Sequence, residues 1–149
     1  MNATSVITNL KRLFFLVLAI QVAFFVSFAF KWIDISSFAA GIPIVVERYA
    51  LLITLIGIPG ALKLFSLIMN KNEDSDDTNS LTATYKKAFI ARFGILSLVA
   101  SLNIILYAFS FNQNFMLLTL ITFTAYIFSY PSNSYLNRTE EVKENEQEE

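Results

Sequence analysis

Residues 93–137 read "FGILSLVASLNIILYAFSFNQNFMLLTLITFTAYIFSYPSNSYLN" and contain no charged side chain. A helix of 45 residues would extend roughly 67 Å, about twice the hydrocarbon thickness of a bilayer. The chain must therefore turn back within this run, and the amides of "SFNQNF" at 110–115 mark the turn. We predict spans at 88–111 and 115–130, the second ended by Pro131, which disfavours helical geometry just before it.

Two more apolar stretches come before this hairpin. Residues 13–30 carry no charge, would extend roughly 27 Å as a helix, and are followed by Lys31 and Trp32. Residues 45–69 form the other stretch and are interrupted by Lys63. A cleaved signal peptide is the alternative for the first stretch, with "SFA" at 37–39 as the site. We favour a span, because a signal core is usually about 7–15 residues.

The composition supports this assignment. Only 15% of the 149 residues are charged and 55% are hydrophobic, whereas soluble domains carry about 25% charged residues. The sequence therefore predicts an all-α polytopic membrane protein with four transmembrane helices arranged as two hairpins in a helical bundle. The predicted parts are a cytoplasmic segment 1–12, a membrane domain 13–132 with a solvated cytoplasmic loop 70–87, and an acidic disordered tail 133–149.

Basic residues predict the orientation of the chain. With four spans both termini lie on one side, together with the loop at 70–87. Nine of the 11 Lys and Arg residues then fall on or near that side, and only Lys31 and Arg48 fall on the other. Because cytoplasmic loops are enriched in Lys and Arg, we expect both termini in the cytoplasm.

Several kinds of chemistry have no support in the sequence. The chain has no Cys and no His, which removes thiolate and imidazole ligands and the commonest general base. We identify no pair of carboxylates at one membrane depth and expect no cofactor and no metal site. A net charge of −1 gives no indication of nucleic-acid binding. We therefore expect a protein that is not an enzyme.

The stretch "IGIPGALKLF" at 56–65 breaks the pattern of the second span. Pro59 lacks the donor for one helical hydrogen bond, and Gly57 and Gly60 flank it, so we predict a kink and name Thr54 as a candidate partner for the freed carbonyl. The alternative is that the glycines let another helix approach closely. Lys63 would then only extend its long stem to the headgroups.

A second cation gives Lys63 a functional alternative. Arg92 enters the third span at a similar depth, and Asn103, eleven residues later, shares its helix face to within about 20°. If Lys63 and Arg92 face inward, they form a cytoplasm-facing basic pocket with Lys86 and Lys87 below it. Such a pocket suits phosphate headgroups or other anions. The alternative for Arg92 is again an extension toward the headgroups.

Other polar residues predict packing. Gln21 and Asn103 lie within spans and are expected to hydrogen-bond to other helices. Glu47 and Arg48 are an outer-side candidate site, although a carboxylate near a helix N-terminus is favourable by itself. Small residues predict packing faces at Ala19, Ala23 and Ser27, and at Gly94, Ser97, Ser101 and Ala108. On the fourth span Thr119, Thr122 and Thr124 are expected to bond back to their own helix.

Three segments carry a resemblance to known proteins. The runs "ERYALLITLIGIPGALKLF" at 47–65 and "RFGILSLVASLNIILYAF" at 92–109, followed by "YPS" at 130–132, resemble a group of uncharacterised small four-span bacterial membrane proteins. The resemblance covers roughly residues 45–132. It implies the bacterial inner membrane and carries no activity and no site residues.

These observations lead to two functional expectations. The first is a non-enzymatic subunit or accessory partner of a membrane assembly, whose partners are the bilayer and another membrane protein or a second copy of itself. The second is a lipid- or anion-binding module, or a small oligomeric transporter, that uses the Lys63 and Arg92 pocket with anionic lipid as a candidate ligand.

Overall fold

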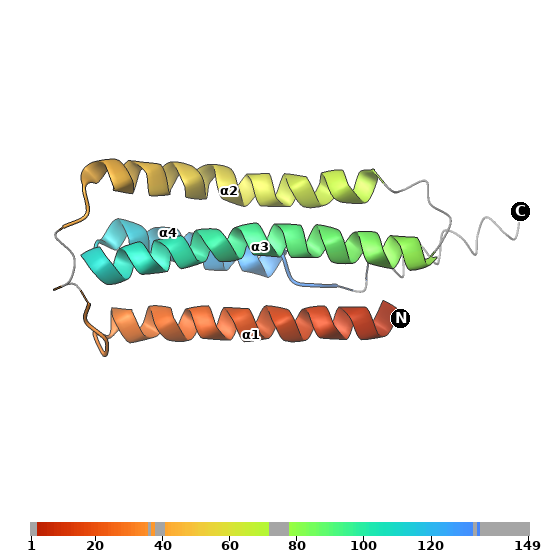
Figure 1. Ribbon diagram of the computed structural model, residues 1–149, viewed down its shortest axis with the longest axis horizontal. Helices are drawn as coiled ribbons and strands as arrows, with labels where there is room; N and C mark the ends of the chain where they lie inside the picture. The colour runs from red at the N-terminus through yellow and green to blue at the C-terminus, as the bar shows by residue number, and fades with distance from the viewer. Residues whose placement is uncertain (1–2, 36, 38–40, 72–77, 133, 135–149) are drawn as a thin grey trace, which may run out of the picture.

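The computed structural model describes residues 3–35, 37, 41–71, 78–132 and 134, and this part of the chain forms four helices (Figure 1). They are α1 (Ala3–Ala29), α2 (Ile44–Asn70), α3 (Thr78–Ser110) and α4 (Gln113–Phe128). The first three are long and apolar enough to cross a membrane, whereas α4 has only 16 residues. The predicted loop residues 72–77 and the predicted acidic tail from residue 135 onward lie outside the described residues.

The third helix is the centre of the bundle. It packs against α1, α2 and α4, and Figure 1 shows α1 and α2 on opposite sides of it, with α4 behind it. The helices run antiparallel in sequence order, and α3 with α4 forms the predicted second hairpin. The predicted first hairpin is wrong in its packing, because α1 and α2 are held apart by α3 instead of lying against each other.

The bundle has two distinct ends. We call the end with Ala3, Asn70 and Thr78 the terminal end, and the end where α1 and α3 finish the turn end. Near the terminal end the core contains Leu10, Phe65 and Phe89, among other apolar side chains. At the turn end, Trp32 is 73% exposed and stacks on Phe30, a position that suits aromatic residues at a membrane–water interface.

The second helix packs on α3 mainly through small residues. Its buried side chains are Ala50, Thr54, Ala61 and Phe65, spaced at turns of one helix face. Gly57 lies on the same face, and a Cβ built there would come 2.9 Å from Cγ2 of Val99, so this glycine permits close approach. Gly60 has no atom within 4 Å of such a Cβ. The helix is continuous through Pro59, and Figure 1 shows its two halves nearly in line.

Two helices begin earlier than the hydropathy of the chain predicts. The predicted loop 70–87 is wrong over residues 78–87, which form the first turns of α3, and α1 already begins at Ala3. Tyr85 and Ala88 of α3 and Val6 and Leu10 of α1 are buried at helical spacing. These segments are amphipathic and pack on each other and on α2, which stabilises helix where average hydropathy is low.

The fourth helix has clear signals at both ends. Asn112 caps its start, accepting a hydrogen bond from the backbone N–H of Asn114 at 2.9 Å, which confirms the predicted turn. The helix ends at Phe128, shortly before Pro131, as predicted. The predicted back-bonding is also confirmed, since the three threonine hydroxyls donate to carbonyls four residues earlier, at Thr119, Thr122 and Thr124.

A matched pair of substitutions tests the close contact between α2 and α3. We expect Gly57→Ala to destabilise the fold by roughly 1 kcal/mol, because the new Cβ meets the stiff side chain of Val99. Gly60→Ala meets nothing and should leave stability unchanged or higher. Thermal unfolding in detergent measures both, and Val99→Ala should cost less in the Gly57→Ala background than in the unmodified chain. Equal effects of the two alanines would contradict the packing.

Candidate functional site

Several of the buried polar side chains form three levels along α3, and each level connects α3 to other helices. The middle level is built around Gln21 of α1, which is 7% exposed. Its Nε2 donates to the carbonyl oxygen of Ser97 at 3.0 Å and to Oγ of Ser101 at 3.0 Å. Its Oε1 accepts from the hydroxyl of Tyr126 at 2.7 Å. This network joins α1, α3 and α4 and confirms the predicted cross-helix role of Gln21.

The level nearer the turn end connects α3 with α2. Asn103 is fully buried, and its Nδ2 donates to Oγ1 of Thr54 at 2.8 Å. The Thr54 hydroxyl in turn donates to the carbonyl oxygen of Ala50 at 2.8 Å. Its hydrogen is therefore not given to the carbonyl that Pro59 leaves without a donor, which is the bond predicted for it. The predicted cross-helix bond of Asn103 is therefore confirmed. Interhelical hydrogen bonds of this kind are worth about 0.6–2 kcal/mol.

The level nearer the terminal end is built around Arg92 of α3, which is 7% exposed. Its guanidinium carbon lies 4.0 Å from the ring centroid of Phe65 on α2, a cation–π contact. Its Nη2 donates to the carbonyl oxygen of Ser129 at 3.1 Å. Ser129 is the C-cap of α4, where unpaired carbonyls and the helix dipole both favour a cation. Arg92 therefore caps the end of α4.

Tyr85 continues this role one step further along the chain. Its hydroxyl accepts from the backbone N–H of Ser132 at 3.1 Å and donates to the carbonyl of Ser132 at 3.3 Å. Ser132 belongs to the non-helical segment that follows α4. Irregular backbone inside a membrane protein must find partners within the protein. Arg92 and Tyr85 supply these partners, a shared role that no motif in the sequence indicates.

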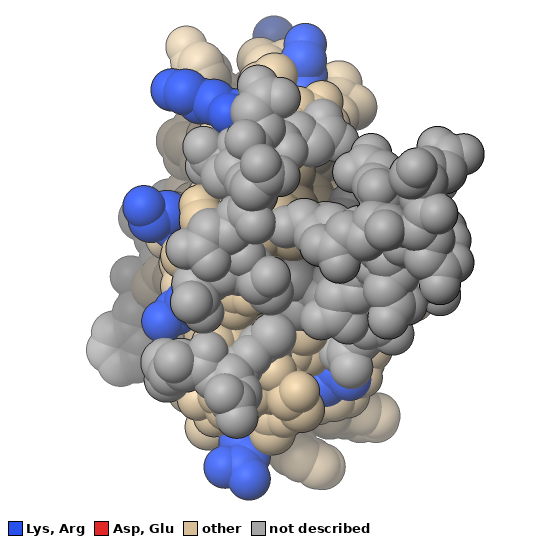
Figure 2. All heavy atoms as spheres, turned by 90° about the vertical axis from the view of Figure 1, so that its right-hand side faces the viewer, with Lys and Arg blue, Asp and Glu red and all other residues tan. Residues whose placement is uncertain are grey.

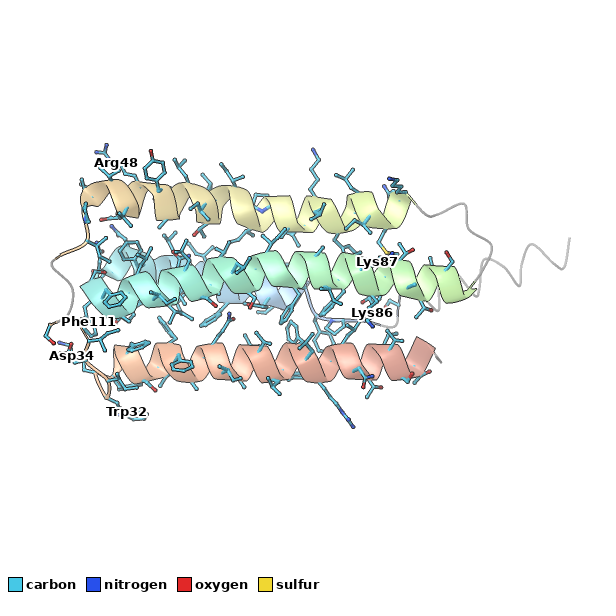
Figure 3. All side chains as sticks on the ribbon, viewed as in Figure 1. Trp32, Asp34, Arg48, Lys86, Lys87 and Phe111 are labelled. Atoms are coloured by element: carbon cyan, nitrogen blue, oxygen red, sulfur yellow. The ribbon has the colours of Figure 1, made fainter. Side chains whose placement is uncertain are left out.

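The four cations of the hypothetical anion pocket are not brought together. Lys63 is exposed and lies two residues from Phe65, so it points roughly 200° around α2 from the face on Arg92. Lys86 and Lys87 are exposed on α3, near the terminal end (Figure 3). Arg92 and Asn103 do share a face, as predicted, and that face contacts α2.

The outer-side candidate has a role that sequence reasoning missed. Glu47 lies in the first turn of α2, as expected for a carboxylate near a helix N-terminus. Its carboxylate also accepts hydrogen bonds from the amides of Asn112, at 3.0 Å, and Asn114. It thereby holds the turn between α3 and α4 against α2. Arg48 points away into the surroundings (Figure 3). The amides of this turn are the sequence signal for the contact with Glu47, although by themselves they indicate only where the chain turns.

One cavity lies between α1 and α3. It has a volume of about 340 Å³ and is lined by isoleucine and phenylalanine side chains together with Gln21 and Ser101. The two polar residues are hydrogen-bonded to each other. The cavity therefore offers an apolar surface, which suits an acyl chain and not a charged ligand. The predicted packing face of Ala19, Ala23 and Ser27 is not used within the chain, because Ala19 and Ala23 are exposed.

Within the ranges that the structure describes, no three His, Cys, Asp or Glu side chains are grouped as metal ligands. The polar groups at the three levels of α3 bond to other helices, and their arrangement can fix helix positions. It offers no nucleophile with an adjacent base, which is the usual sign of a catalytic centre.

A double-mutant cycle tests the middle level. We expect Gln21→Leu to destabilise the fold by about 1–3 kcal/mol, because it removes bonds to two helices and leaves the Tyr126 hydroxyl without its acceptor. Tyr126→Phe should cost less, and the double variant should cost less than the sum of the two. Thermal unfolding in detergent gives the three values, and strict additivity would contradict a direct bond.

A second pair of variants tests the cap of α4. Arg92→Met should destabilise the fold by about 1–3 kcal/mol, because the Ser129 carbonyl loses its donor. Lys63→Met removes the same charge at a similar depth from an exposed side chain and should change stability little. Thermal unfolding of both variants decides between them. Equal loss in the two would mean that charge alone, and not the cap, stabilises this end.

A scan against protein-family models, a search of curated proteins and a search of solved structures each found no match to this chain. The resemblance to small four-span bacterial membrane proteins therefore stays a prediction.

Proposed function

We propose that the chain is a four-span protein of the bacterial inner membrane, with both termini in the cytoplasm, that acts as a non-enzymatic subunit or accessory partner of a membrane assembly. The observation that carries this proposal is how the polar and apolar residues are divided. Buried polar side chains such as Gln21 and Asn103 bond helices to each other, while α1 and α2 leave apolar faces uncovered on opposite sides of the bundle.

The length and level of α4 support a fourth span. Sixteen helical residues rise about 24 Å. The helix alone therefore crosses most of the ~30 Å hydrocarbon layer. The non-helical residues 129–132 continue from its end toward the terminal end of the bundle. Arg92 and Tyr85 pair the backbone of this segment, which satisfies the requirement that lipid places on irregular chain.

The distribution of charge supports the orientation. Figure 2 looks at the terminal end and shows Lys and Arg atoms around the edge of the bundle. Seven of the nine described Lys and Arg residues lie toward this end, whereas Lys31 and Arg48 lie at the turn end. The two described acids, Asp34 and Glu47, also lie at the turn end. This excess of basic residues supports a cytoplasmic location for the terminal end.

Exposed apolar surface supports a partner. On α2 the side chains of Leu55 and Ile56 are 65% and 68% exposed, and on α1 Leu16 is 58% exposed. Because α1 and α2 do not cover each other, each presents most of its circumference outward. Such faces suit packing against helices of another membrane protein or of a second copy.

Native mass spectrometry of the full chain, extracted gently from its own membrane, tests the proposal. We expect a defined protein, or a second copy of this chain, at fixed stoichiometry. A photo-reactive residue placed at Leu55 or Leu16 should cross-link to that partner, whereas the same probe at Thr8, near the start of α1, should not. A lone monomer with robust enzymatic activity and no cross-linked protein would contradict the proposal.

A further inference from the structure

Contacts between the helices fix which cations share a level along the bundle axis. On α2, Phe65 lies over Arg92 of α3, and the two helices run antiparallel. Lys63 precedes Phe65 by two residues, so it is level with residue 94 of α3, two residues after Arg92. Lys71, six residues after Phe65, is level with Lys86, six residues before Arg92. These levels follow because both helices rise about 1.5 Å per residue.

The first helix is placed in the same way. It runs parallel to α3, and the rings of Phe14 and Phe93 lie 5.6 Å apart. Lys11 and Arg12, which precede Phe14 by three and two residues, are therefore level with residues 90 and 91 of α3. The three cations Lys11, Arg12 and Lys63 thus fall between the levels of residues 90 and 94 of α3, within about 6 Å along the axis, and we call them the boundary ring. The buried guanidinium of Arg92 and the end of α4 lie within this range too.

A second set of cations lies further out. Lys71, Lys86 and Lys87 share a level close to residue 86 of α3, and we call them the distal ring. From the boundary ring to the distal ring the distance along the axis is on the order of 8 Å. Both rings contain three basic residues, and the side chains are exposed except for that of Lys11, which is half-buried.

The outer surface of α1 changes character at the boundary ring. On its turn-end side α1 exposes Phe15 and Leu16, which are 56% and 58% exposed. On its terminal side the same helix exposes Thr8 and Asn9 and buries its apolar residues. A polar outer face next to a buried apolar face is typical of a helix in water, and an apolar outer face is typical of one in lipid. The membrane surface therefore crosses the bundle at this ring.

We propose that Lys11, Arg12 and Lys63 bind the phosphate groups of anionic phospholipids in the leaflet at the terminal end. This proposal rests on the membrane insertion put forward above and not on the role in an assembly. Basic residues close to a membrane surface contribute about 1 kcal/mol each toward anionic lipid, and the effect falls off within a Debye length, about 8 Å at physiological salt. The boundary ring lies within reach of the headgroups, and the distal ring lies about one Debye length beyond.

The side chains of the boundary ring are placed to act in this way. Lys11 extends over the ring of Tyr130, with its Nζ 5.6 Å from the ring centroid, and Tyr130 is 43% exposed. A tyrosine with its ring against apolar groups and its hydroxyl in water is typical of the membrane interface. Lys63 lies on the outer side of α2, away from Phe65. Both cations are therefore directed to the circumference of the bundle, where lipid headgroups would lie, and not to its interior.

Two triple variants of equal charge change test the proposal. The full chain is placed in nanodiscs of phosphatidylcholine with a minor fraction of phosphatidylglycerol, and the retained lipids are measured by native mass spectrometry. Replacing Lys11, Arg12 and Lys63 by Gln should reduce retained phosphatidylglycerol by about fivefold for each lipid site lost, the equivalent of ~1 kcal/mol. Replacing Lys71, Lys86 and Lys87 by Gln should change it little.

The outcomes separate the alternatives. Equal loss in the two triple variants, or no loss in the first, would overturn the proposal. Inorganic phosphate added in excess should not displace the lipid, and displacement would assign the ring to a free anion instead. Thermal unfolding should be similar in all three proteins, since the six side chains are exposed or half-exposed. The nanodiscs contain this chain alone, so a negative lipid result does not contradict the proposed role in an assembly. In the same way, finding no partner protein does not contradict lipid binding.

Discussion

The end of α4 imposes the constraint on which the rest of the bundle depends. A helix that stops inside or at the edge of a membrane leaves carbonyls that water does not satisfy. Here the C-cap carbonyl of Ser129 receives the Nη2 of Arg92, and Tyr85 takes up the backbone of Ser132 beyond it. Because both donors come from α3, the level at which α4 ends is tied to one position on α3. Arg12 of α1 and Lys63 of α2, both exposed, lie close to the level of that position.

The arrangement around α3 follows from the residues that face each neighbour. Small side chains and Gly57 let α2 approach closely, and Asn103 adds one bond to Thr54. Gln21 holds α1 to α3 and, through Tyr126, to α4. None of these interactions joins α1 to α2. The result is a bundle whose two outer helices are separated, each with one face on α3 and an uncovered face on the opposite side.

Much of this fold could be predicted from local signals. The uncharged run from residue 93 requires a turn, Pro131 marks the end of α4, and the threonines of α4 have near carbonyls to bond. The cross-helix bonds of Gln21 and Asn103 were expected because an amide in lipid needs a partner. Each of these signals is local: it depends on one residue and its own helix, or on the free-energy cost of leaving a polar group without a hydrogen bond.

The errors concern relations between helices. The charged side chains of residues 78–87 lower the average hydropathy of this segment. The average does not show that Tyr85 and Ala88 fall on one buried helix face, so hydropathy alone does not predict the start of α3. The predicted pairing of Lys63 with Arg92 depends on their similar depth in the membrane. Depth does not determine in which direction a side chain points around its helix, and Phe65, not Lys63, faces Arg92. Glu47 and the amides of Asn112 and Asn114 were recognised separately, because 65 residues of chain separate them.

The account places the membrane surface near residue 92 of α3, so that the helix continues beyond the bilayer for several turns. Spin labels on cysteines introduced one at a time at Ala83, Ile90, Leu98 and Ile105 measure this directly, since the chain has no natural Cys and these side chains are exposed. In nanodiscs, the labels at 98 and 105 should be relaxed by oxygen, and the label at 83 by a water-soluble nickel chelate, with 90 between them. A label at 83 as deep in the hydrocarbon as one at 98 would contradict the account.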